Sequence, residues 1–195
     1  GHDLAGVLGY RDIADTDAMI AAARDGGPAV VIGGGLLGLE AANGLRARGV
    51  DVTVVHLMPT LMERQLDDTA GRLLQASLAA RGIRFVLPAT TRALLGDTAG
   101  HVAAVELADG SRLPARLVVM AVGIRPDIAL AQAAGLQCRR GILVDDTLQT
   151  YDPRVYAVGE CVEHRDRTYG LVAPLFEMAK VAANHLAARG HARYT

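Results

Sequence analysis

Several residue types are scarce in this chain of 195 residues, and the scarcity of cysteine excludes two kinds of stabilising site. The sequence contains no tryptophan, two phenylalanines, two cysteines and a single lysine. Cys138 and Cys161 lie far apart and form no C-x-x-C pair. A disulfide framework and a structural zinc site are therefore not indicated, and we expect no metal site. A reducing cytoplasm is the simplest compartment for such a chain.

Long apolar runs and strong charge bias are also missing. No apolar stretch approaches the ~20 residues that a membrane span needs, so we expect no membrane partner. The N-terminus, Gly-His-Asp-Leu, lacks the charged and apolar regions of a signal peptide. The formal net charge is −1, and the basic residues are spread along the chain. Without a basic stripe, nucleic acid is not an expected partner.

The chain is organised around a glycine motif in residues 29–56. An apolar run leads into Gly33-x-Gly35-x-x-Gly38, and a helical pattern and a second apolar run follow. Strand, glycine turn, helix and strand form the context that makes this motif a dinucleotide-binding fingerprint. Gly33 permits a tight turn, Gly35 lets a pyrophosphate approach the backbone, and Gly38 lets the helix pack closely. The alternative is a turn that merely needs glycines.

The start of the following helix, which contains Leu36 and Leu37, completes this expected nucleotide site. Its free N–H groups and the positive end of its dipole favour phosphate groups.

The stretch after this motif continues the alternation of strands and helices. Asp67 and Asp68 start a helix to about Arg81, with Leu73, Leu74, Ser77 and Leu78 expected on its buried side. Residues 83–87 and 117–122 are typical of buried parallel strands. Between them, residues 90–95, 101–107 and 112–114 predict an antiparallel meander with a turn at Asp109-Gly110. The fold class is therefore α/β, with a Rossmann-like three-layer nucleotide domain and this small meander.

The two ends of the chain carry weaker patterns. Near the N-terminus, Asp15 or Thr16 can cap a helix that runs through Arg24. Beyond residue 140, residues 142–145 and 155–158 predict short strands, and a polar loop at 162–168 would leave His164 on the surface. A helix follows with Pro174 at its first position. Its expected apolar face consists of Leu175, Met178, Ala179, Ala182 and Leu186.

Three separated segments, residues 33–40, 121–126 and 155–160, together resemble the flavoprotein reductases of the pyridine nucleotide-disulfide oxidoreductase family. Their order matches the nicotinamide domain followed by the last part of the flavin domain. Within that family, residues 57–67, 159–161 and 169–174 look most like the large subunits of assimilatory NAD(P)H-dependent nitrite reductases. The resemblance implies that NAD(P)H reduces FAD, and that electrons pass on to an iron–sulfur cluster and siroheme, where nitrite becomes ammonia.

The resemblance also divides the chain into three parts. We expect an FAD-domain remnant and linker helix at 1–25, an NAD(P)H-binding domain at 26–140 and a C-terminal FAD-domain segment at 141–195. The family's first glycine motif, which binds the FAD pyrophosphate, and its cluster and siroheme cysteines do not occur in these residues. We therefore expect a fragment that is inactive alone and whose partners are the missing FAD and siroheme domains. Another flavoprotein reductase, of the rubredoxin reductase, ferredoxin reductase or NADH oxidase type, is the alternative enzyme.

A nucleotide-binding module without catalysis is the alternative of a different class. A truncated flavin domain would expose apolar surface, and a second copy of the chain is one candidate to cover it.

In the nicotinamide part, four further positions are candidates for cofactor binding. His56 ends the second strand, where an acidic residue would accept the 2′-hydroxyl of the adenine ribose. A neutral imidazole can bond that hydroxyl, a protonated one favours a 2′-phosphate, and a surface role is the alternative. Arg64 is a second candidate for a 2′-phosphate. Glu40 suits the helix dipole and, by resemblance, the nicotinamide carboxamide; Gly123 allows close approach of a ligand at a strand end.

In the flavin part, the candidates come from the resemblance. It implies that Gly159 and Glu160 lie at the FAD site, with Glu160 bonding the ribityl chain. It also implies that Val172, Ala173 and Pro174 lie beside the flavin pyrimidine ring. No residue is assigned a catalytic role, and Cys161 is expected to be a small apolar residue rather than a redox thiol.

Overall fold

The computed structural model describes all residues, 1–195, and divides them into two compact units, Gly1–Gly123 and Ile124–Thr195. The division falls after Gly123, where we expected a boundary at residue 140. Residues 1–25 also belong to the first unit, where we expected a remnant of another domain. The N-terminal residues belong to the first unit because β1 (Val7–Leu8) joins its central sheet by parallel pairing with β8 (Leu117–Met120).

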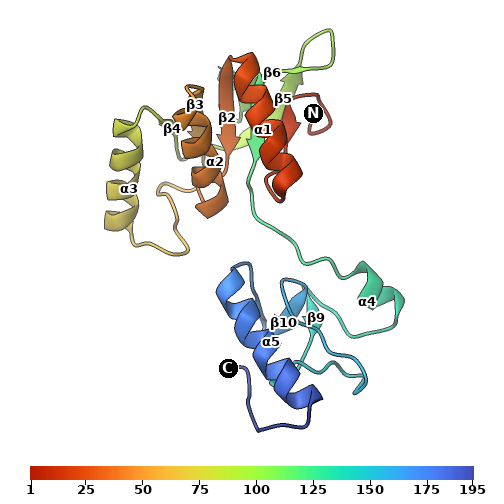
Figure 1. The fold of residues 1–195 in the computed structure, drawn as a ribbon. Coiled ribbons are helices and arrows are strands. Elements are labelled where there is room, and N and C mark those ends of the chain that lie inside the picture. Colours follow the sequence, from red (N-terminus) through yellow and green to blue (C-terminus); the bar gives the residue numbers. More distant parts are fainter. The chain divides into compact units, whose positions relative to one another are not determined.

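A five-stranded parallel sheet forms the centre of the first unit (Figure 1). Its strand order is β1-β8-β2-β3-β4, in which β2 is Pro28–Ile32, β3 is Asp51–Val55 and β4 is Arg84–Val86. The parallel strands expected around residues 29–32, 50–55, 83–87 and 117–122 are therefore confirmed. Sequence neighbours β2 and β3 pair in register, and β8 returns to the opposite side of β2.

Each face of this sheet has its own apolar core. Side chains alternate along a strand, so Val31 and Val119 face one core while Val30 and Val118 face the other. The first core is closed by helices α1 (Ile13–Asp25), α2 (Leu36–Ala47) and α3 (Asp68–Ala80). The second is closed by the antiparallel sheet β5-β6-β7 (Thr91–Gly96, Val102–Leu107, Arg112–Pro114). The predicted three layers and meander are confirmed.

Aspartate side chains cap the first turns of α1 and α3. Helix α1 begins at Ile13 because Asp12 caps it, with Asp15 completing a capping box, so the cap predicted at Asp15 or Thr16 is wrong. Helix α3 begins as predicted, with Asp67 accepting from the Ala70 N–H at 2.8 Å. Its predicted buried side is only partly right, because Leu78 is buried while Leu73 is 68% exposed and Ser77 is exposed.

The second unit is built from short elements. They are α4 (Ala129–Ala133), β9 (Ile142–Leu143), β10 (Val162–His164), β11 (Arg167–Thr168) and α5 (Val172–Leu186). The expected strand at 155–158 is wrong, since only a single bridge joins Tyr156 to Gln149. The expected polar loop is a hairpin instead, because Arg165 and Asp166 both adopt positive φ and turn β10 into β11. Pro174 is the third residue of α5, not the first.

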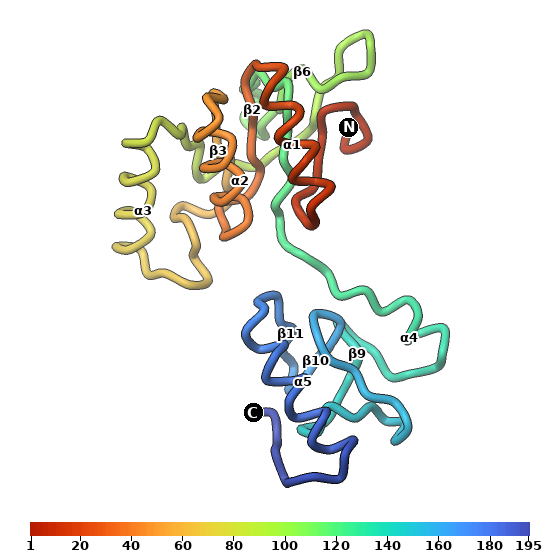
Figure 2. The backbone as a smooth tube through the Cα atoms, viewed as in Figure 1, coloured from red at the N-terminus to blue at the C-terminus, as the bar shows by residue number.

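The core of the second unit gathers under α5. Met178 and Ala182 of α5 pack with Leu148 and Val162, whereas Ala179 and Leu186, expected on the same face, are exposed. The chain turns back after α5, so that Tyr194 reaches this core and donates its N–H to the Asp146 carbonyl (Figure 2). Among all the helices, none combines the length and apolar character that a membrane crossing requires.

Candidate functional site

The glycine turn between β2 and α2 has the geometry of a phosphate cradle. Gly33 has φ +120°, and a Cβ there would run into the Ala121 carbonyl, so only glycine fits. A Cβ on Gly38 would run into the Gly33 carbonyl, which shows how closely α2 approaches the turn. Around Gly35, in contrast, the space is open, with no atom within 4 Å of an added Cβ. The close contacts thus lie behind the turn, and the open side faces outward.

Helix α2 leaves its first N–H groups available on that open side. Gly35 is the N-cap and supplies no side-chain cap, so the amides of Leu36, Leu37 and Gly38 need another acceptor. Leu36 and Leu37 are 43% and 37% exposed. Uncapped amides at the positive end of a helix, beside open space, fit a pyrophosphate.

His56 is tied to the glycine turn and to Glu63. It follows β3 directly, and its side chain is only 10% exposed. The Gly34 N–H donates to His56 Nδ1 at 3.0 Å, and Nε2 lies 3.0 Å from Glu63 Oε2. A backbone N–H can only donate, so Nδ1 carries a lone pair and the ring proton lies on Nε2, which donates to the carboxylate.

Glu63 presents a negative charge beside this turn. Burial acts to raise the pKa of Glu63, but its own backbone N–H, the His56 side chain and the charge of Arg64 together lower it below its ordinary value. The Glu63 side chain is 31% exposed. Met62, next to Glu63, donates its N–H to the Gly34 carbonyl at 3.1 Å. The Gly34 N–H in turn donates to His56, which also contacts Glu63. Both backbone groups of Gly34 are therefore linked to the segment that carries Glu63. Gly34 and Glu63 were not among the sequence candidates, because no periodic pattern links residues seven apart across a loop.

Of two further candidates in the first unit, Gly123 lies near the glycine turn and Glu40 lies on the surface of α2. Gly123 lies at the end of the segment that follows β8, and its neighbours Ala121 and Val122 lie against Gly33. Gly123 has φ +101°, and no atom lies within 4 Å of a Cβ added to it. The structure therefore brings the end of β8 beside the glycine turn. Glu40 lies on α2 and is exposed.

The candidates of the second unit lie on a loop and at a helix start. Gly159 has φ +101° and open space around it, and Glu160 beside it is half-buried. Helix α5 begins at Val172, which is 65% exposed, with no side-chain cap from Leu171. Since Pro174 has no N–H, the free amides of this first turn are those of Val172 and Ala173. An exposed, uncapped helix start fits an anionic ring or phosphate.

Cys161 and His164 play other roles. Burial raises the pKa of the Cys161 thiol, so this side chain is a poor nucleophile and stays close to the apolar residue we predicted. His164 is 1% exposed, so its predicted surface position is wrong. Its Nε2 lies 2.8 Å from Asp146 Oδ1, its ring packs edge-on against Tyr194, and its Nδ1 has no partner. It is part of the core of the second unit.

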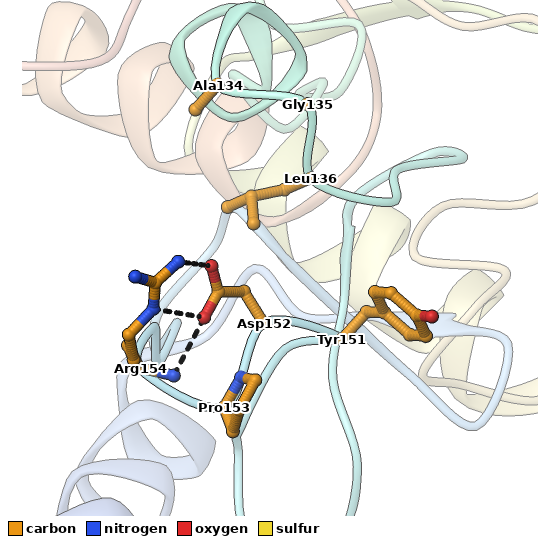
Figure 3. Close-up of a pocket in the computed structure, with 7 residues that line it drawn as sticks. All are labelled: Ala134, Gly135, Leu136, Tyr151, Asp152, Pro153 and Arg154. Atoms are coloured by element: carbon orange, nitrogen blue, oxygen red, sulfur yellow. Dashed lines mark hydrogen bonds and ion pairs between the residues drawn. The ribbon is translucent and has the colours of Figure 1, made fainter.

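A pocket of about 380 Å³ in the second unit contains none of the candidates (Figure 3). Its lining residues are Ala134, Gly135, Leu136, Tyr151, Asp152, Pro153 and Arg154. Arg154 bonds both oxygens of Asp152 and, through hydrogen bonds, lowers the pKa of that carboxyl to about 2. The charged groups of the pocket satisfy one another, so we assign it no ligand.

Comparison with known proteins identifies the family. The model of the pyridine nucleotide-disulphide oxidoreductases matches residues 2–185. The chain belongs to this family. It is 55% identical over 186 residues to the nitrite reductase [NAD(P)H] of Bacillus subtilis, and 48% identical over 186 residues to that organism's assimilatory nitrate reductase electron transfer subunit. These matches cover 95% of this chain but 23% and 24% of the two relatives, so the chain spans about a quarter of their length.

Solved structures support the same family. A ferredoxin reductase from Rhodopseudomonas palustris superimposes with a TM-score of 0.92 at 32% identity, covering all of this chain and 49% of that one. The resemblance to this oxidoreductase family, derived from residues 33–40, 121–126 and 155–160, is thus confirmed.

Proposed function

We propose that this chain is the NAD(P)H-binding and FAD-contacting part of a nitrite reductase. Hydride would pass from NAD(P)H to FAD, and electrons would continue to iron–sulfur and siroheme centres held by other parts of a longer protein. The observation that carries the proposal is the 55% identity to the Bacillus subtilis nitrite reductase over nearly the whole chain. Bound FAD would accept a hydride and release electrons one at a time, and the protein would position it.

The residues of the first unit would bind the dinucleotide. The amides of Leu36, Leu37 and Gly38 would hold its pyrophosphate, with Gly35 allowing the backbone approach. Gly123, beside the turn at a strand end, leaves room for the ligand. Glu40 is exposed on α2 and would reach the nicotinamide end.

The residues of the second unit would contact the flavin. Glu160 would accept hydrogen bonds from the ribityl hydroxyls, and Gly159 would let the backbone lie close to the cofactor. The start of α5, at Val172, Ala173 and Pro174, would stabilise negative charge on the pyrimidine ring through its dipole.

The test separates nucleotide binding from nitrite reduction. The 195-residue chain is expected to bind NADH without reducing nitrite, whereas the intact protein that contains it should form ammonia from nitrite with NADH as the electron donor. An intact protein that oxidises NADH and leaves nitrite unchanged would overturn the assignment.

A ferredoxin reductase type is the second candidate, favoured by the superposition on the Rhodopseudomonas palustris enzyme. In that case the intact protein should reduce a small iron–sulfur protein instead of nitrite. If the intact protein binds NADH and reduces neither acceptor, the nucleotide-binding module without catalysis is the better description.

The apolar residues on the outside of α5 and its approach suggest a protein partner. Leu171, Val172, Phe176 and Leu186 are each 53–65% exposed. We propose that the remaining FAD domain of the intact protein covers them, in a reducing cytoplasm where Cys138 and Cys161 stay free. The alternative is that a second copy of the chain covers these residues. In that case light scattering of the isolated chain should show a dimer at high concentration.

A further inference from the structure

At the position that normally binds the adenine ribose, this chain has a histidine whose two ring nitrogens are both already hydrogen-bonded. His56 ends β3, but Gly34 holds its Nδ1 and Glu63 holds its Nε2. An imidazole has only these two polar atoms, so His56 has none left for a ribose hydroxyl. Its ring also packs against Gly34, where an added Cβ would approach His56 Cγ to 2.7 Å. His56 therefore acts on the glycine turn and not directly on the ligand.

The carboxylate of Glu63, which is hydrogen-bonded to His56, can bind the ribose hydroxyl in its place. It is anchored through Nε2 of His56, and the Glu63 side chain is 31% exposed. Its pKa lies below the ordinary value of 4.5, so the carboxylate is ionised at neutral pH. The Met62 bond to Gly34 ties the same segment to the glycine turn. A fixed negative charge is thus present at the strand end, although no acidic residue follows β3 directly.

We propose that His56 and Glu63 work as one unit that selects NADH against NADPH. Glu63 supplies the carboxylate that accepts the 2′-hydroxyl and repels a 2′-phosphate, and His56 is the positioning residue that fixes both Glu63 and Gly34. This inference rests on the proposed nucleotide-binding function and adds the identity of the selecting residue.

Arg64 is the neighbouring charge that acts in the opposite direction. It is exposed, and its charge contributes to the lowered pKa of Glu63. If Arg64 dominated the site, it would attract a 2′-phosphate and the chain would prefer NADPH. The two adjacent residues therefore give a matched pair of variants with opposite expected effects.

The experiment titrates the purified protein with NADH and with NADPH and compares the ratio of the two dissociation constants. Wild type is expected to bind NADH more tightly. Glu63→Gln should reduce that preference about tenfold, mainly by tighter NADPH binding, since a 2′-phosphate carries a charge of roughly −1.5 to −2. Arg64→Gln should raise the preference instead, and Glu63→Asp, which keeps the charge, should retain most of it.

Variants of His56 test its positioning role. His56→Asn places an oxygen where Nδ1 accepts from Gly34 but cannot reach Glu63; it should keep NADH affinity within a few-fold and lose selectivity. His56→Ala loses both contacts and should weaken both nucleotides. If Glu63→Gln changed both nucleotides equally, or if wild type preferred NADPH, the inference would be overturned while the proposed function stood. Failure of wild type to bind either nucleotide would overturn both.

Discussion

Three consecutive glycines, Gly33 to Gly35, are needed for three different physical reasons. Gly33 needs its positive φ and the space against Ala121, and Gly34 needs room for the His56 ring. Gly35 has φ −86°, which any residue can adopt, and open space around it. Only the third glycine is therefore dispensable for folding, and we propose that the open space beside it accommodates the ligand.

This difference makes Gly35→Ala a test of the nucleotide site. The added methyl group would occupy the cradle, so we expect NADH affinity to fall at least tenfold, or ~1.4 kcal/mol, with a change in unfolding free energy below ~1 kcal/mol. Gly44→Ala is the control, since Gly44 lies inside α2 with open space around it and the change should stabilise by ~0.5–1 kcal/mol without affecting affinity. Unchanged affinity in Gly35→Ala would contradict the cradle.

Asp146 makes the second unit sensitive to acid. Hydrogen bonds from Arg165, and then from His164, lower the pKa of Asp146 from 3.8 to about 2. Because the folded pKa is depressed, the stabilisation is complete above pH ~4 and is lost as the pH falls toward 2. Asp146→Asn should therefore lose less stability than wild type between pH 5 and pH 2.5, measured by denaturant unfolding. Equal losses would show that Asp146 does not contribute.

Capping decides where the helices begin. Asp12 and Asp15 satisfy each other's backbone N–H groups at the start of α1, which holds Met19 in the core of the first unit. An N-cap of this kind fixes the helix start independently of the apolar periodicity. The same holds at Asp67 of α3.

We expect Asp12→Ala to destabilise the first unit by ~1 kcal/mol, because one orphan N–H of α1 loses its acceptor. Asp17→Ala, on the exposed side of the same helix, is the matched control and should change stability by less than ~0.5 kcal/mol. The measurement is urea unfolding followed by circular dichroism. Similar effects of both substitutions would refute the role of the cap.

The whole chain consists of two units with separate apolar cores. The proposed nucleotide site, from Gly33 to Gly123, lies wholly in the first unit. A ligand stabilises only the structure that binds it.

Thermal unfolding is expected to show two transitions, with NADH raising only the one that belongs to residues 1–123. At a hundredfold excess over the dissociation constant, the gain is ~2.7 kcal/mol. Scanning calorimetry with and without NADH tests this, and the variant Gly35→Ala should remove the shift. A shift of both transitions by equal amounts would contradict the assignment of the site to one unit.

Much of the fold follows from local sequence. The strand at 29–32, the glycine turn and the helix after it could be predicted because apolar runs and glycines act over a few residues. The hairpin of β10 and β11 was not predicted, since Arg165-Asp166 lacks the glycine that marks most two-residue hairpin turns. In the structure both residues adopt positive φ, and β10 also pairs with β9. Val155 and its neighbours look like a strand by composition but find no partner strand.

For the site, the sequence by itself determined the glycine turn, because glycine has no side chain and its positions can be seen directly in the sequence. The tertiary structure alone decided what His56 does. Its two nitrogens meet Gly34, 22 residues before it, and Glu63, seven residues after it, and only the folding of the loop after β3 brings these groups together. Hydrogen bonds between residues so far apart depend on chain geometry, which no local pattern of residue types encodes.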